Sequence, residues 1–162
     1  MLTQALENAK ASGRSDIAEY LTLKSTNDTV RQAGATWLFD TVLEIAAAAN
    51  RNNSGISIER TDPHNFPFRG ANIVGSMLRL RQGVRCLTTE AGWTRTPADG
   101  FMRGGALAAA RITHLGMTKQ NVELVLQKTP GPPVWHILRD EKAAEHFRSD
   151  ALLDHFQIFL GG

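Results

Sequence analysis

Hydrophobic and polar residues alternate most clearly in residues 76–96, SMLRLRQGVRCLTTEAGWTRT. Leu78 and Leu80 alternate there with Arg79 and Arg81. A side-chain period of two places the leucines on one face of a strand and the arginines on the other. We therefore expect a half-buried strand at the centre of a sheet.

A turn signal at Gln82-Gly83 predicts that this strand continues into a hairpin. A two-residue loop at Gln82-Gly83 would pair charged with apolar side chains, so we expect a three-residue loop, Arg81 to Gly83. The resulting register pairs Leu80 with Val84, Leu78 with Cys86 and Arg79 with Arg85. Like charges that face each other destabilise a sheet. A nearby carboxylate such as Glu90, solvent, or a bound anion would offset this cost.

Helical spacing of apolar residues precedes the hairpin. Residues 2–21 predict one kinked helix or two short ones, with a weak point at Ser12-Gly13. A second helix is predicted from the apolar stripe between Val30 and Ala49. It follows the capping residues 25–28 and ends in the polar run 50–55. We expect it to lie across the inner face of the sheet.

Two prolines and two phenylalanines in residues 62–70, DPHNFPFRG, argue against regular structure. We favour a loop held in place by burial of Phe66 and Phe68. The alternative is a lid or an interface loop in which His64, Phe66 and Phe68 meet a ligand or a partner.

The remaining pattern is rich in strands. Strands are expected at 56–60, 106–115, 121–129 and 134–140, with a short helical start at 97–102 and a final helix capped by Asp140. For residues 103–116 a helix that ends at Gly116 is the alternative, which the internal glycines disfavour. The predicted fold class is α+β. Two N-terminal helices pack on a largely antiparallel, curved sheet of five or six strands, with a possible C-terminal helix.

Composition indicates one ordinary globular domain covering residues 1–162. The single cysteine, Cys86, cannot form an internal disulfide, and it falls on the apolar face of the predicted hairpin. The N-terminus lacks a signal-peptide pattern, and no apolar run is long enough to span a membrane. These features predict a cytoplasmic protein with no membrane partner.

Charge is distributed unevenly along the chain. Residues 60–111 contain eight arginines, no lysine and three acids, a net charge of +5, which leaves −3 for the rest of a chain of net charge +2. Arginine forks suit carboxylates and phosphates. Trp93 and Arg95 are expected on one strand face as a platform beside a cation. The predicted ligand-binding residues are therefore Arg79, Arg81, Arg85, Trp93 and Arg95.

No motif in the sequence names a reaction. The five histidines and one cysteine match no zinc pattern, and no phosphate loop, nucleophile elbow or dinucleotide fingerprint occurs. We therefore expect no metal, no cofactor and no assigned catalytic residue. An acid/base site remains an alternative if its candidates converge in the fold: Asp62, His64, Glu90, His114 and His136.

These observations favour a non-catalytic binding or interaction module for a small anionic or amphipathic ligand, which also forms a homodimer. The alternatives are a small enzyme with its site in the concavity of the sheet and, ranked lower, nucleic-acid binding through the arginine-rich hairpin.

Overall fold

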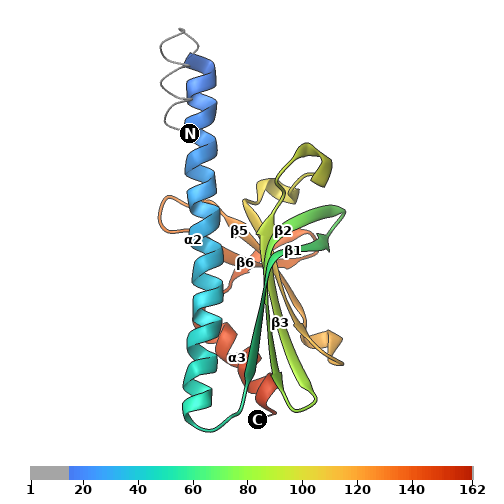
Figure 1. Cartoon of the computed structure of the whole chain (residues 1–162). Coiled ribbons are helices and arrows are strands. Elements are labelled where there is room, and N and C mark those ends of the chain that lie inside the picture. Colours follow the sequence, from blue (N-terminus) through green and yellow to red (C-terminus); the bar gives the residue numbers. More distant parts are fainter. Residues whose placement is uncertain (1–14, 162) are drawn as a thin grey trace.

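A computed structural model describes residues 15–161 of the chain (Figure 1). One long helix is followed by a seven-stranded sheet and a shorter helix, which confirms the α+β class. The helices are α2 (Ser15–Arg51) and α3 (Ser149–Leu160). The strands are β1 (Ser57–Phe68), β2 (Ala71–Gln82), β3 (Arg85–Trp93), β4 (Ala108–His114), β5 (Val122–Gln127), β6 (Val134–Arg139) and β7 (Lys142–His146). Three short 3-10 helices are η1 (Pro97–Asp99), η2 (Arg103–Gly105) and η3 (Thr118–Gln120).

The described chain has one helix before the sheet, where two were predicted. Residues 25–28, expected to start a second helix, lie inside α2. Two of these residues have partners within the helix: the hydroxyl of Thr26 donates to the carbonyl four residues earlier, and Asp28 pairs with Lys24 and Arg31. Oδ1 of Asn27 is buried without a hydrogen-bond partner. The helix predicted over residues 2–12 lies outside the described residues.

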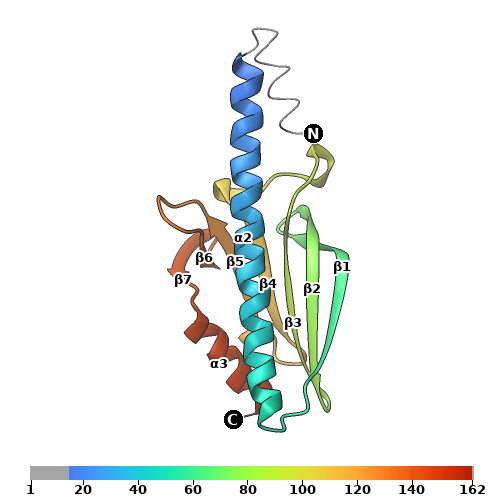
Figure 2. The same cartoon turned by 60° about the vertical axis from the view of Figure 1, so that its left-hand side comes forward.

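The seven strands form one antiparallel sheet in sequence order, β1 to β7. The strand count of five or six was too low. Helices α2 and α3 pack on the same face, where Leu38, Val42, Leu80, Leu124 and Phe156 are buried in one core (Figure 2). This packing confirms the expected position of the long helix. No helix among residues 15–161 is long and apolar enough to cross a membrane.

A glycine pair lets the sheet curl away from the helices. Gly75 and Gly92 face each other on β2 and β3, and a Cβ on either would lie 1.9 or 2.3 Å from a backbone carbonyl oxygen of the other strand. Since β3 therefore presents no side chain there, residues of β1 and β2 meet those of β4 and β5 across it. They form a second apolar cluster that includes Phe66, Phe68, Ile73, Ala109 and Val125.

The prediction of an irregular loop at 62–70 was wrong, because most of this segment belongs to β1. A register shift between Thr61 and His64 accommodates Pro63, and β1 is an edge strand, where prolines are tolerated. Phe66 and Phe68 are buried, as the favoured interpretation required.

The predicted hairpin exists, but its register was wrong. Gln82 pairs with Arg85, Arg81 with Cys86 and Arg79 with Thr88, which leaves the two-residue loop Gly83-Val84. Gly83 has a φ of +60°, as at the first loop position of a type II′ turn. Arg79 and Arg85 are consequently not opposite each other, and Cys86 is not on the apolar face.

Three segments near the C-terminal half were predicted correctly, namely β4, β5 and β6, and η1 confirms the helical start at 97–102. The final helix was placed too early. Asp140 and Glu141 both have positive φ values, so they form the turn between β6 and β7 rather than a helix cap. Helix α3 then begins at Ser149.

Candidate functional site

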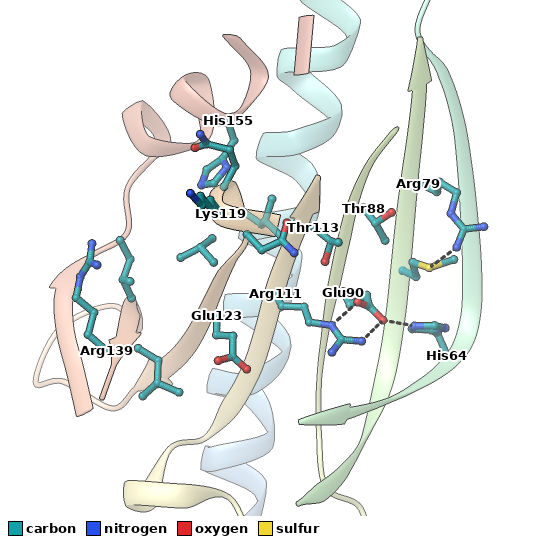
Figure 3. A pocket seen from close by; sticks show the side chains of 17 residues that line it. His64, Arg79, Thr88, Glu90, Arg111, Thr113, Lys119, Glu123, Arg139 and His155 are labelled. Atoms are coloured by element: carbon teal, nitrogen blue, oxygen red, sulfur yellow. Dashed lines mark hydrogen bonds and ion pairs between the residues drawn. The ribbon is translucent and has the colours of Figure 1, made fainter. Parts of the chain in front are cut away.

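The face of the sheet opposite α2 and α3, here called the open face, carries polar side chains in two neighbouring rows (Figure 3). The strand register aligns Arg79, Thr88 and Thr113 in one row across β2, β3 and β4. The second row runs from β2 to β5 and consists of Met77, Glu90, Arg111 and Glu123. The alternation that keeps apolar residues under the helices places these groups together.

These rows line a cavity of about 900 Å³, called the hollow below. Met77 of β2 and Leu138 of β6 contribute apolar side chains to it. Val122 and Ile137 also border it, but their side chains pack against the core under the helices. His155 of α3 and Lys119 of η3 also line it. The hollow thus combines a floor of polar and charged side chains with a smaller number of apolar ones.

Glu90 is the centre of the polar network. It is only 6% exposed, and its Oε1 accepts a hydrogen bond of 2.7 Å from Nε of Arg111. Its Oε2 lies 2.7 Å from Nε2 of His64 and 3.4 Å from Nη2 of Arg111. Figure 3 shows His64 and Arg111 reaching the carboxylate from opposite sides.

The pKa of Glu90 decides what this network can do. Burial by itself would raise the pKa of this carboxyl, but the hydrogen bonds and charges of Arg111 and His64 outweigh burial and lower it. Glu90 is therefore an ionised acceptor, and His64 must hold its proton on Nε2.

Arg111 also fixes β1 over the open face. Its Nη1 donates to the carbonyl of Pro67 at 3.2 Å, and its guanidinium lies 5.1 Å from the ring centroid of Phe66. Arg111 on β4 therefore contacts a strand three positions away in the sheet. The network has a structural role in holding the curl, besides setting the charge of the hollow.

The hollow has an excess of cationic side chains. Both carboxylates in its lining are paired, Glu90 with Arg111 and Glu123 with Arg69. Among the described residues, Arg79 has no carboxylate within ion-pair distance and donates only to the sulfur of Met77, at 3.7 Å. Lys119 likewise has no carboxylate partner in residues 15–161. An anion entering the hollow thus meets cations that are not neutralised.

The structure divides the predicted ligand-binding residues among separate places. Arg79 lines the hollow, whereas Arg81 lies beyond it near the end of β2. Arg85 is on the helix side, where its Nη1 donates to the carbonyl of Phe159 at 3.3 Å. It caps the last turn of α3.

Trp93 and Arg95 do lie together, but on the helix side of the sheet. The guanidinium of Arg95 is 3.9 Å from the ring centroid of Trp93, and it donates to the carbonyl of Val74. Both residues border clefts of about 450 and 490 Å³ beside α2. One face of the predicted platform is therefore already covered.

The predicted acid/base residues converge only in part. His64 and Glu90 meet in the hollow, and Asp62 pairs with Arg60 on the edge strand. His114 is buried on the helix side against His155, and His136 packs against His146. No cluster of three or more His, Cys, Asp or Glu side chains suited to a metal occurs within residues 15–161.

Sequence reasoning missed Arg111, Thr88 and Thr113 as lining residues. Thr88 lies on β3, whereas Arg111 and Thr113 lie on β4. Both strands were predicted, and the alternation of β4 placed Arg111 and Thr113 on one face. What the sequence does not contain is the register between β3 and β4, which sets Arg111 beside Glu90.

Comparisons with known proteins add no assignment. No protein-family model matches the chain, and neither the curated proteins nor the solved structures include a match. The functional interpretation therefore rests on the geometry of the site.

Proposed function

We propose that the protein is a binding module that holds a small anionic or amphipathic ligand in the hollow of the open face. The observation that carries the proposal is Arg79, a cation that lines the hollow without a carboxylate partner among the described residues. Thr88 and Thr113, next to it in the same row, add two hydroxyl groups able to donate hydrogen bonds.

The surroundings of this row favour an anion over a cation. Glu90, the buried carboxylate nearby, is already saturated by Arg111 and His64 and offers little to a cation. Arg79 is partly buried, so its charge is less screened than that of a fully exposed arginine. Leu138 and Met77 border the same hollow and offer apolar contact to the carbon skeleton of an amphipathic ligand.

A fluorescence titration with 8-anilinonaphthalene-1-sulfonate, an anionic aromatic probe, tests this proposal. Arg79→Ala removes a charge-assisted hydrogen bond and should weaken probe binding about tenfold or more. The matched control is Arg148→Ala, which removes an exposed arginine outside the hollow and should leave the affinity unchanged. Equal affinities for the wild type and Arg79→Ala would disprove the assignment.

Native mass spectrometry of freshly purified protein extends the test to natural ligands and to self-association. A small mass retained by the wild type and absent from Arg79→Ala would identify the ligand class. The homodimer predicted from the sequence is a separate proposal, and a monomeric mass at every concentration would reject it. The buried positions of Phe66 and Phe68 remove them from any such interface unless β1 moves.

A second candidate function is proton transfer by His64, favoured by its 2.7 Å contact with Glu90 in the hollow. A carboxylate that orients an imidazole is a common arrangement in general acid/base sites. The test is incubation of the retained molecule with protein in D₂O. Deuterium incorporation into its C–H positions by the wild type but not by His64→Gln is expected, and equal incorporation would reject the function.

A further inference from the structure

Four segments meet at the end of the molecule where α2 and α3 both terminate, at the bottom of Figure 1. They are residues 51–55, 81–86, 115–121 and 157–161, here called the basal end. Hydrogen bonds join them: Nε2 of Gln82 donates to the carbonyl of Ser54 at 2.7 Å, and the amide of Leu115 donates to the carbonyl of Cys86 at 3.1 Å. Arg85 adds the contact with the end of α3.

The turns of the basal end carry exposed apolar side chains at their tips. Val84 is 94% exposed, Leu115 65% and Met117 37%. Val84 is the second residue of a two-residue turn, where a polar residue could adopt the same backbone conformation. Nothing in the fold therefore requires an aliphatic side chain there. Exposed single hydrophobic residues are common, but several on adjoining turns mark a surface that contacts something apolar.

The charge of the basal end has one sign. Its four segments contain Arg51, Arg81, Arg85 and Lys119 and no aspartate or glutamate. A second copy of the same surface would be repelled by these charges, which argues against self-association at this end. A partner surface that is complementary must be anionic.

We propose that the basal end docks on the surface of an anionic lipid bilayer. Val84 and Leu115 enter the interfacial region, while the arginine and lysine side chains lie among lipid phosphates. The sequence-based expectation of no membrane partner rested on the lack of a spanning segment, and docking at a surface requires none.

A bilayer fits this end better than a macromolecular partner does. The apolar side chains stand on separate turn tips and are not gathered in a groove, so a protein partner would need a matched pocket for each. A fluid interface accepts separate protruding side chains without such matching. A nucleic acid would use the cations but gain nothing from exposed aliphatic tips.

Co-sedimentation of the full chain with lipid vesicles tests the proposal. The vesicles consist of phosphatidylcholine alone, or of two parts phosphatidylcholine to one part phosphatidylglycerol. Only the anionic vesicles should sediment the protein. Val84→Ser with Leu115→Ser should weaken that binding about tenfold or more, and Arg81→Ala about fivefold.

Two matched variants control for loss of apolar area and of charge elsewhere. Phe101→Ser removes an aromatic residue that is 84% exposed on a different loop, and Arg148→Ala removes a charge outside the basal end. Both should bind anionic vesicles as the wild type does. Circular dichroism checks that all variants are folded, and the single variants Val84→Ser and Leu115→Ser serve if the double variant is not.

Three results would overturn the proposal. They are no sedimentation with anionic vesicles, unchanged binding by Val84→Ser with Leu115→Ser, and an equal loss in Phe101→Ser. Tighter binding to a DNA duplex than to anionic vesicles in the same buffer, unaffected by the two serine substitutions, would assign the surface to nucleic acid instead.

Discussion

The buried carboxylate of Glu90 has both a structural and a chemical role. Taking a carboxylate out of water is costly, and only close cationic or hydrogen-bonding partners offset the cost. Arg111 and His64 supply them from strands on both sides of β3. The contacts of Glu90 with Arg111 and His64 therefore hold β1 across the open face and also keep the Glu90 carboxyl ionised.

Replacing Glu90 with glutamine should lower the free energy of unfolding by about 2 kcal/mol, because Arg111 loses the charge that balances it and His64 loses its charged acceptor. Urea denaturation measures the change. The control is Glu145→Gln, which breaks an ion pair with Arg139 whose side chains are 60% and 64% exposed. Its effect should stay below about 0.5 kcal/mol. Equal effects of the two substitutions would show that the Glu90 network does not stabilise the fold.

A histidine pair between β4 and α3 makes stability depend on pH. Nε2 of His114 lies 2.8 Å from Nδ1 of His155. Burial, and then the neighbouring His114, lower the pKa of His155 to about 4, with Asp154 acting in the opposite direction. Because the unfolded chain binds this proton near pH 6.5, stability should fall as the pH is lowered from about 6.5 to about 4.

Denaturation curves across that pH range test this dependence. In the wild type, the free energy of unfolding should fall between about pH 6.5 and about pH 4. In His155→Gln this fall should be smaller by on the order of 1–2 kcal/mol, less than the full pKa shift implies because solvent screens the partly exposed ring. His146→Gln, at an exposed position, should keep the wild-type slope. An unchanged slope in His155→Gln would assign the pH dependence to other groups.

At the scale of elements, the curl of the sheet depends on the Gly75 and Gly92 pair. Gly92→Ala would place a Cβ 2.3 Å from the carbonyl oxygen of Val74, a backbone atom that cannot turn away. Thermal or urea unfolding should show a loss of about 2–3 kcal/mol. Gly131→Ala is the control, since nothing lies within 4 Å of its added Cβ. A loss no larger than that of the control would mean that the strands are not in such close contact.

The elements that the sequence predicted well are those whose hydrophobic period decides their structure. β2, β4, β5, β6 and the C-terminal half of α2 bury one regular face against the core, and each was expected near its observed position. The errors fall where period and local signals conflict. β1 contains prolines but is an edge strand, and residues 25–28 resemble a helix start but lie inside a helix.

The site could be predicted only in its components. Arg79 was expected to face away from the leucines, and it does line the hollow. Its supposed neighbour Arg85 is on the other face, because the pattern favoured a core position for Val84 and the fold exposes that residue instead. Contacts such as His64 with Glu90 depend on the glycine pair and on a register shift in β1, which no local pattern encodes.

At the scale of the whole molecule, the helix layer and the sheet meet at Gly34. Its carbonyl accepts a hydrogen bond of 3.0 Å from the indole of Trp135, and an added Cβ would lie 2.6 Å from Cδ2 of Leu126. Leu126 is fully buried, so its methyl groups have little room to move. Gly34 therefore sets how closely α2 approaches β5, and through β5 it supports the wall of the hollow.

Two opposite effects compete in Gly34→Ala. Alanine is about 1 kcal/mol better than glycine inside a helix, whereas forcing a methyl group into a packed core costs about 1–3 kcal/mol. In the wild-type background the steric overlap should outweigh the gain in helix propensity, so urea denaturation should show a lower free energy of unfolding. In a Leu126→Ala background the obstructing methyl groups are gone, so the same substitution should stabilise the protein by about 1 kcal/mol. Such a reversal of sign is not expected from helix propensity alone, and its absence would mean that Gly34 and Leu126 are not in contact.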